Sequence, residues 1–149
     1  MPTVEFVSHI DHVIKATTES LERAAEIIGG MMETKAKLYV TDAVYASPEG
    51  WYVRTGNLRN SITHDAVADE HNVTIAVGSA VEYAPYVELG TGVYAEDGKG
   101  RKTPWMYQDA RGNWHRTNGM PARPFLRPAV ENYVKEYKAV LESELSKTP

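Results

Sequence analysis

Cysteine is absent from this chain of 149 residues. Without cysteine there is no disulfide framework, no zinc–thiolate site and no thiol nucleophile. Long apolar runs are missing too: no stretch approaches the roughly 20 residues that a membrane helix needs, so no membrane association is expected. The first residues lack a basic segment followed by an apolar one, so no signal peptide is predicted.

An excess of positive charge is also missing: 16 Lys and Arg against 20 Asp and Glu give a net charge of −4, which disfavours bulk binding of nucleic acid. The charge is unevenly spread, however. Basic residues outnumber acidic ones between Glu96 and Arg127, and the rest of the chain is acidic. This asymmetry indicates a surface for a partner or for a neighbouring subunit of complementary charge. Because the length is typical of one domain, we expect a single domain over residues 1–149.

Both ends of the chain have the spacing of amphipathic helices. Apolar or small residues recur at steps of three and four through residues 6–45, which predicts one long helix or two in series. Gly29-Gly30 predicts a kink or break in this helix. Near the other end, Pro124 and Pro128 suit a helix start, and helical spacing predicts a C-terminal helix over residues 124–146.

The middle of the chain, residues 51–118, is typical of strands and turns. Leu58–Ala68 and Val73–Val77 are predicted strands, and Tyr83–Leu89 is predicted as one helical turn closed by glycine. Trp105–Gln108 and Asn113–Arg116 flank a turn that contains Asp and Gly, which predicts a hairpin. The order predicts an α+β fold: an antiparallel sheet packed by the long N-terminal helix and the C-terminal helix, with a protruding hairpin and loop arm.

The residue patterns that carry chemistry elsewhere are weak in this chain. His9 and His12 are spaced for one helix face, yet a third zinc ligand and a nearby base are missing. Glu82 and Glu88 resemble the paired carboxylates of hydrolases, but surface acids are the simpler interpretation. No serine lies in a nucleophile elbow, and the glycine spacing before Lys102-Thr103 does not fit a phosphate loop. We therefore predict no catalytic residue, metal ligand or cofactor, and no enzyme.

Residues 99–116 form the segment whose composition points most strongly to a binding surface, because basic and aromatic residues are interleaved in it. Such a segment binds nucleic acid by phosphate contact and base stacking, or it anchors a protein interface. The acidic remainder of the chain favours a protein partner, and an arm lining a channel for DNA satisfies both interpretations. The candidate contact residues are Lys99, Arg101, Lys102, Trp105, Tyr107, Arg111, Trp114 and Arg116.

Three ordered segments resemble a known family: Arg54–Ile62 (RTGNLRNSI), Tyr83–Thr91 (YAPYVELGT) and Pro121–Ala129 (PARPFLRPA). In this order they are similar to the tail-component family of the Hong Kong ninety-seven type of phage. The resemblance implies a structural virion protein of the neck or upper tail, assembled in the host cytoplasm. It also implies a ring of sixfold symmetry around the DNA channel, neighbouring tail or connector proteins as partners, and no cofactor.

The resemblance also suggests a structural role for each matched residue. Thr55-Gly56 is expected to form the turn that starts the first strand, with Leu58 in the core. Tyr83, Pro85 and Tyr86 are expected to pack a short turn against the sheet. Glu88, beside Gly90-Thr91, is expected to accept a hydrogen bond from the backbone or from an arginine. The candidate arginines are Arg54, Arg59 and Arg123, and Pro124-Phe125 is expected to fix the last helix to the core. The segment Gly92–Asn118, called the arm below, is expected to reach a neighbouring subunit.

Overall fold

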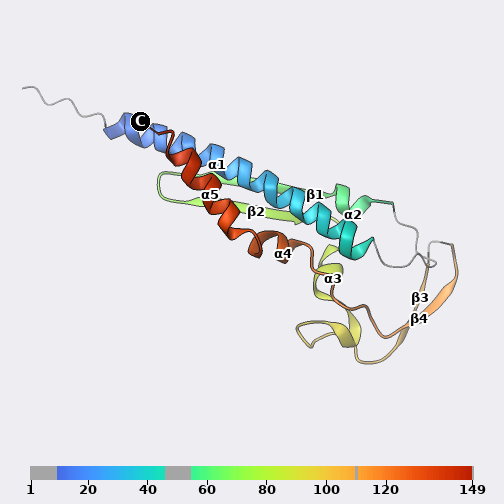
Figure 1. Ribbon diagram of the computed structural model, residues 1–149. Coiled ribbons are helices and arrows are strands. Elements are labelled where there is room, and N and C mark those ends of the chain that lie inside the picture. The colour runs from blue at the N-terminus through green and yellow to red at the C-terminus, as the bar shows by residue number, and fades with distance from the viewer. Residues whose placement is uncertain (1–9, 46–54, 110, 149) are drawn as a thin grey trace, which may run out of the picture. The chain divides into compact units, whose positions relative to one another are not determined.

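The computed structural model describes residues 10–45, 55–109 and 111–148 (Figure 1). In chain order the elements are helix α1 (Ile10–Tyr39), the π-helical turn η1 (Val40–Val44), helix α2 (Asn57–Asn60), strands β1 (Ile62–Ala68) and β2 (Val73–Ser79), helix α3 (Ala84–Leu89), the 3-10 turn η2 (Gly92–Tyr94), strands β3 (Trp105–Gln108) and β4 (Trp114–Thr117), and helices α4 (Leu126–Glu131) and α5 (Val134–Leu145). The predicted α+β class is confirmed. The described strands form two separate two-stranded sheets, β1–β2 and β3–β4.

Helix α1 runs without interruption through Gly29-Gly30, where a kink or break was predicted. A β-carbon at Gly29 would lie 2.4 Å from the Cδ2 atom of His64 on β1, so the missing side chain makes room for that ring. His64 is held there because its Nε2 lies 2.8 Å from Oε1 of Glu26 on α1. The glycine therefore serves close packing rather than bending. Residues 6–9 of the predicted helix lie outside the described part of the chain.

Internal packing divides the chain into two compact units, and α1 contributes residues to both. The first unit contains the chain up to Met31, His64–Ala76 and the chain from Tyr133 onward; the second contains Met32–Thr63 and Val77–Asn132. The prediction of a single domain stays a prediction.

In the first unit α5 lies along the N-terminal part of α1 (Figure 1). Small residues of α1, Ala24 and Ala25, are fully buried and permit close packing. Glu144 of α5 is buried as well, and it pairs with Lys147 at 2.7 Å and with Arg23 of α1 at 3.5 Å. Lys147, and then Arg23, hold the pKa of Glu144 below its ordinary value despite the opposing effect of burial.

The second unit has a core that draws on five helical elements and one strand. Its buried apolar residues are Ala36, Val40, Leu58, Ile62, Ala84, Val87, Phe125 and Ala129. Because Leu58, Val87 and Phe125 belong to the three matched segments in turn, these segments form one hydrophobic core although they are far apart in sequence. Phe125 and Ile62 are the largest side chains of this core that are completely buried.

The first predicted strand begins later than expected. Asn57–Asn60 form the short helix α2, and β1 starts only at Ile62. Gly56 has a φ of 76°, which places it in the left-handed region, and it precedes the helical turn. The hydroxyl of Ser61 donates to the carbonyl oxygen of Leu58 at 2.7 Å and closes that turn. Thr55-Gly56 therefore lead into a helical turn, because nearby polar side chains form hydrogen bonds with backbone groups of that turn.

The predicted C-terminal helix is interrupted. It forms α4 and α5, separated at Asn132-Tyr133, two residues of modest helix propensity. The side-chain amide of Asn132 donates to the hydroxyl of Tyr39 at 3.2 Å, and the backbone of Tyr133 leaves the helical region with a φ of −124° and a ψ of 22°. In the described part of the chain no helix is both long and apolar enough to cross a membrane.

Candidate interaction surface

Glu88 of α3 joins the second matched segment to the third. It is only 8% exposed, and its Oε2 accepts hydrogen bonds from the backbone N–H groups of Phe125 (2.7 Å) and Leu126 (2.9 Å). Its Oε1 accepts a third from the N–H of Arg127 at 3.0 Å. These N–H groups lie at the start of α4 and have no partner within that helix, so the carboxylate caps it. Glu88 is thus a structural residue held by backbone groups.

Glu88 is expected to accept a hydrogen bond from the backbone or from an arginine, and the backbone alternative is confirmed. The guanidinium of Arg59 lies 6.0 Å from the ring centroid of Tyr45, and the backbone N–H of Arg123 donates to the carbonyl oxygen of Val87 at 2.7 Å. Arg54 lies outside the described residues. Pro124 precedes Phe125 in the segment that leads into α4 and is partly buried.

Two hydrogen bonds between Thr91 and Met120 close the base of the arm. The N–H of Thr91 donates to the carbonyl oxygen of Met120 at 2.8 Å, and the N–H of Met120 donates to the Thr91 hydroxyl at 2.9 Å. The N–H of Val93 donates to the carbonyl oxygen of Asn118 at 3.0 Å. A β-carbon at Gly92 would lie 2.0 Å from that same oxygen. The backbone segments at Gly92 and Asn118 therefore approach too closely for any residue other than glycine.

Tyr83, Pro85 and Tyr86 do not pack as expected. Tyr83 is 37% exposed and Tyr86 is 59% exposed, and Pro85 is exposed as well. The residues of α3 that enter the core are Ala84 and Val87, spaced by three as on one face of a helix. The aromatic rings of this segment therefore belong to the surface. Gly90, with a φ of 77°, ends α3 as predicted.

The β3–β4 hairpin of the arm has two different faces. Its antiparallel register pairs Trp105 with Thr117, Met106 with Arg116, Tyr107 with His115 and Gln108 with Trp114. Because side chains alternate along a strand, Trp105, Tyr107, His115 and Thr117 share one face, and these residues are partly buried. The opposite face, called the outer hairpin face below, consists of Met106, Gln108, Trp114 and Arg116, all exposed. The two tryptophans therefore lie on opposite faces.

Asp109 organises the turn of this hairpin. Its Oδ1 accepts the backbone N–H groups of Arg111 (2.8 Å) and Asn113 (2.9 Å), and its Oδ2 lies 2.8 Å from Nε2 of His115. The bond to His115, reinforced by the backbone of Asn113 and Arg111, holds the pKa of Asp109 well below its ordinary value. Tyr107 stacks on His115 with ring centroids 5.4 Å apart. Partial burial, and then the charge of Asp109, raise the pKa of Tyr107.

A groove of about 500 Å³ lies beside the arm in the second unit. Its lining includes Tyr86 and Leu89 of α3 together with Lys99, Arg101 and Trp105 of the arm. The guanidinium of Arg101 lies 5.6 Å from the ring centroid of Trp105, a cation–π distance.

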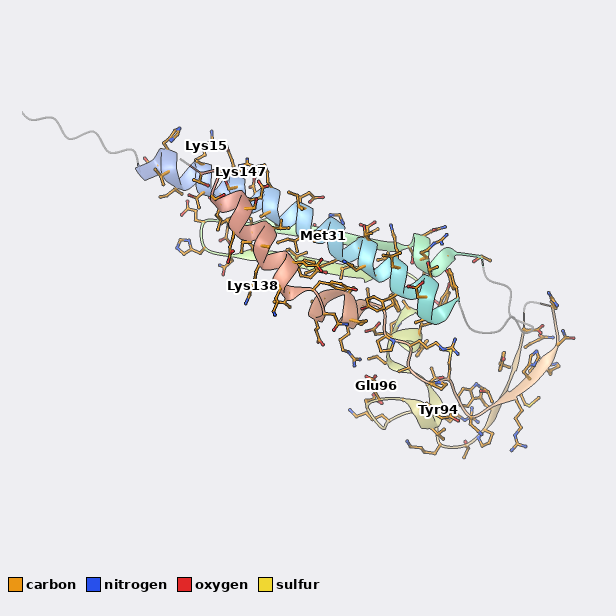
Figure 2. All side chains as sticks on the ribbon, in the orientation of Figure 1. Lys15, Met31, Tyr94, Glu96, Lys138 and Lys147 are labelled. Atoms are coloured by element: carbon orange, nitrogen blue, oxygen red, sulfur yellow. The ribbon has the colours of Figure 1, made fainter. Side chains whose placement is uncertain are left out.

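The loop beside the groove is held to the rest of the unit. Figure 2 shows Tyr94 and Glu96 on this loop. Glu96 pairs with Arg127 of α4 at 2.7 Å, which raises the pKa of Arg127. The N–H of Glu96 donates to the carbonyl oxygen of Leu89, and Oδ1 of Asp97 accepts the N–H of Lys99.

The predicted contact residues thus separate into groups. Lys99, Arg101 and Trp105 meet in the groove, Trp114 and Arg116 lie on the outer hairpin face, and Tyr107 lies on the inner one. Lys102 and Arg111 are exposed. The sequence interpretation missed Met106, which is 54% exposed beside Trp114 at 64%. The sequence does contain a signal for it: side chains alternate between the two faces of a strand, and this alternation places Met106 on the same face as Trp114.

The residues considered for catalysis are dispersed or already engaged. Both carboxylate oxygens of Glu88 accept backbone hydrogen bonds, and Glu82 is exposed. Within residues 10–45, 55–109 and 111–148, no cluster of three His, Cys, Asp or Glu side chains could hold a metal ion. His9 lies outside these ranges.

Comparison with known protein families gives a match. Residues 11–90 match the model of the family described as "Bacteriophage HK97-gp10, putative tail-component". No curated protein and no solved structure matches the chain. The matched range contains α1 from Asp11 onward, the β1–β2 hairpin and α3, and it ends at Gly90, just before the arm.

Proposed function

Because the chain belongs to the HK97-gp10 tail-component family and is a structural component of a phage virion, we propose that it completes the tail at the head–tail joint. In this role several copies form a ring of sixfold symmetry around the DNA channel. The ring contacts neighbouring tail or connector proteins, and the protein catalyses no reaction. It is made and assembled in the host cytoplasm.

The observation that carries this proposal is the way the arm is presented. Its base is fixed by two hydrogen bonds between Thr91 and Met120, and Glu88 caps helix α4 in the same unit. The outer hairpin face nevertheless leaves Trp114 64% exposed and Met106 54% exposed. Large apolar side chains on an ordered hairpin are typical of an interface, where aromatic residues and arginine are enriched.

A ring follows if the arm of each copy contacts a different surface of the next copy. Such a head-to-tail contact repeats, and it closes when its rotation permits. The acidic remainder of the chain supplies charge complementary to the basic arm.

The test is deletion of the gene from its phage, followed by induction and negative-stain electron microscopy of the lysate. We expect filled heads lying beside unattached or aberrant tails. Supplying the wild-type gene from a plasmid should restore joined virions, which controls for effects on neighbouring genes. Intact, infectious virions from the deletion phage would refute the proposed function.

The double substitution Trp105→Ala and Trp114→Ala tests the arm directly. We expect the variant to fold and to fail in complementing the deletion, because the arm loses its aromatic anchors. Circular dichroism and a thermal melt of the purified variant check the fold. The single variants show which surface assembly needs: Trp105→Ala alters the groove, and Trp114→Ala alters the outer hairpin face. Full complementation by the double variant would remove the arm from assembly.

A further inference from the structure

The outer hairpin face lacks a covering segment in the described part of the chain. Met106 and Trp114 expose apolar surface on it, and Arg116, paired with Met106 across the strands, adds a positive charge. Arg111 lies exposed near the turn of the same hairpin. A partner for this face needs an apolar contact surrounded by negative charge.

The first unit contains a surface of that chemistry. A hollow of about 610 Å³ is formed by the N-terminal part of α1 and the turn between β1 and β2. Its lining residues are Asp11, Ile14, Lys15, Thr18, Glu19, Glu22, Asp69 and Glu70. Lys15 is the single base among five acids, and Ile14 is 37% exposed there. We call this surface the acidic hollow.

We propose that the outer hairpin face of one copy docks into the acidic hollow of a second copy of this chain. Trp114 contacts the apolar surface at Ile14, and Arg116 and Arg111 face the carboxylates of Glu22 and Glu70. The inference rests on the proposed function, and it names both surfaces of the contact between neighbouring copies.

Charge complementarity argues for a second copy as the occupant. The cations of the arm are solvated and exposed, and the acids of the hollow outnumber its base, so bringing the two together relieves like-charge repulsion within each surface. An aromatic anchor inside a charged rim is the usual anatomy of a protein interface. The two surfaces differ, so the contact is heterologous and can be repeated from copy to copy.

The absence of cysteine from the chain permits a direct test by disulfide trapping. Two single variants, Arg116→Cys and Glu22→Cys, are co-expressed in cells carrying the deletion phage, and assembled particles are oxidised and run on a non-reducing gel. We expect a disulfide-linked dimer from the mixed copies and a ladder of higher multimers from the double variant R116C/E22C. The matched control pairs R116C with E142C, on the exposed side of α5 and outside the hollow, and should give no dimer.

Charge reversal provides the second measurement. R111E/R116E and E22K/E70K should each weaken the contact by about 100-fold and fail to complement the deletion. The fourfold variant carrying both reversals should regain complementation, because the attraction is restored with opposite signs. The control E82K/E142K makes the same charge change as E22K/E70K at exposed sites outside the hollow, and should complement.

These experiments also distinguish a second copy from other possible partners of the outer hairpin face. A faster-migrating monomer from R116C/E22C, without a dimer from the mixed single variants, would show that the arm folds onto its own chain and would overturn the inference. DNA as the occupant is indicated if E22K/E70K complements while R111E/R116E does not. If the deletion phage lacks joined virions but no mixed dimer forms, the inference fails and the proposed function stands. If the deletion phage makes normal virions, the proposed function itself fails.

Discussion

At the scale of single residues, Glu88 shows how a buried charge is tolerated. Three backbone donors satisfy its two oxygens, and in turn it supplies acceptors for N–H groups at the start of α4. A buried carboxylate without such donors would be strongly unfavourable. The sequence favours a surface acid over a hydrolytic carboxylate at this position; that interpretation is wrong, because Glu88 is buried and its contacts make it the link between α3 and α4.

Replacement of Glu88 by alanine is expected to destabilise the protein by about 3 kcal/mol, because it leaves buried N–H groups without acceptors. The corresponding fall in Tm is roughly 10 °C. Urea denaturation followed by circular dichroism measures the change. Glu82→Ala is the matched control, since that exposed residue should alter stability by less than about 0.5 kcal/mol. An E88A variant as stable as wild type would contradict the capping role.

Asp109 predicts a pH dependence of the arm. Because its folded-state pKa lies below the ordinary value of 3.8, the ionised carboxylate stabilises the turn above pH 3.8, and this contribution is lost as the pH falls through the folded-state pKa. Fluorescence of Trp105 and Trp114 should therefore be steady at neutral pH and change only in acid. Asp109→Asn should show the altered emission already at pH 7.

The β1–β2 turn supplies a control for that experiment. Oδ1 of Asp69 accepts the N–H groups of His71 and Asn72, each at 2.8 Å, and these backbone hydrogen bonds lower its pKa. Asp69→Asn should weaken this turn and leave the emission of the arm tryptophans unchanged. An equal change of emission in both variants would show that the signal comes from general unfolding.

At the scale of elements, α1 depends on two adjacent glycines that have different roles. A β-carbon at Gly30 would meet nothing within 4 Å, whereas one at Gly29 would collide with the His64 ring. Gly30→Ala is therefore expected to stabilise the protein by about 1 kcal/mol through helix propensity. Gly29→Ala should lose this gain, because the ring must move away from Glu26.

Urea denaturation of both variants measures the difference. The double variant Gly29→Ala and His64→Ala should recover part of the helix gain, because the ring that collides is absent. If G29A were as stable as G30A, the close packing of β1 on α1 would not explain the glycine.

The two hairpins illustrate how similar turns produce different surfaces. Each is closed by an aspartate that accepts N–H groups of its own turn, Asp69 in one and Asp109 in the other. The β3–β4 hairpin additionally carries aromatic residues on both faces, and one of these faces is exposed. The second hairpin is therefore the one suited to contact a partner.

At the scale of the whole molecule, the net charge distinguishes a protein-binding arm from a DNA-binding arm. A net charge of −4 repels DNA, while the arm by itself is basic. We expect the purified protein to bind random duplex DNA no more tightly than roughly 100 µM at physiological salt. Fluorescence anisotropy of labelled DNA at low and moderate salt measures this affinity. Tight binding that falls steeply with salt and is lost in K102E/R111E would favour a nucleic-acid-binding accessory protein.

The sequence by itself determined those features that depend on neighbours along the chain. Helical spacing located α1, the turn that contains Asp109 and Gly112 located the β3–β4 hairpin, and Gly90 located the end of α3. These features depend on backbone hydrogen bonding and burial within a few residues. The local sequence pattern therefore predicts them directly. Two of the three segments that resemble the family, Arg54–Ile62 and Tyr83–Thr91, overlap residues 11–90, which match the family's model, whereas Pro121–Ala129 lies beyond that range.

Only the tertiary structure decided which distant groups meet. Glu88 caps α4 from about 37 residues away, His64 fills the space left by Gly29, and Ala84 and Val87, rather than Tyr83 and Tyr86, face the core. Local pattern cannot predict these contacts, because each depends on how separate segments pack and which buried donors then need acceptors. The division of the arm into a groove and an outer hairpin face has the same origin, since it depends on which side of the hairpin the rest of its unit covers.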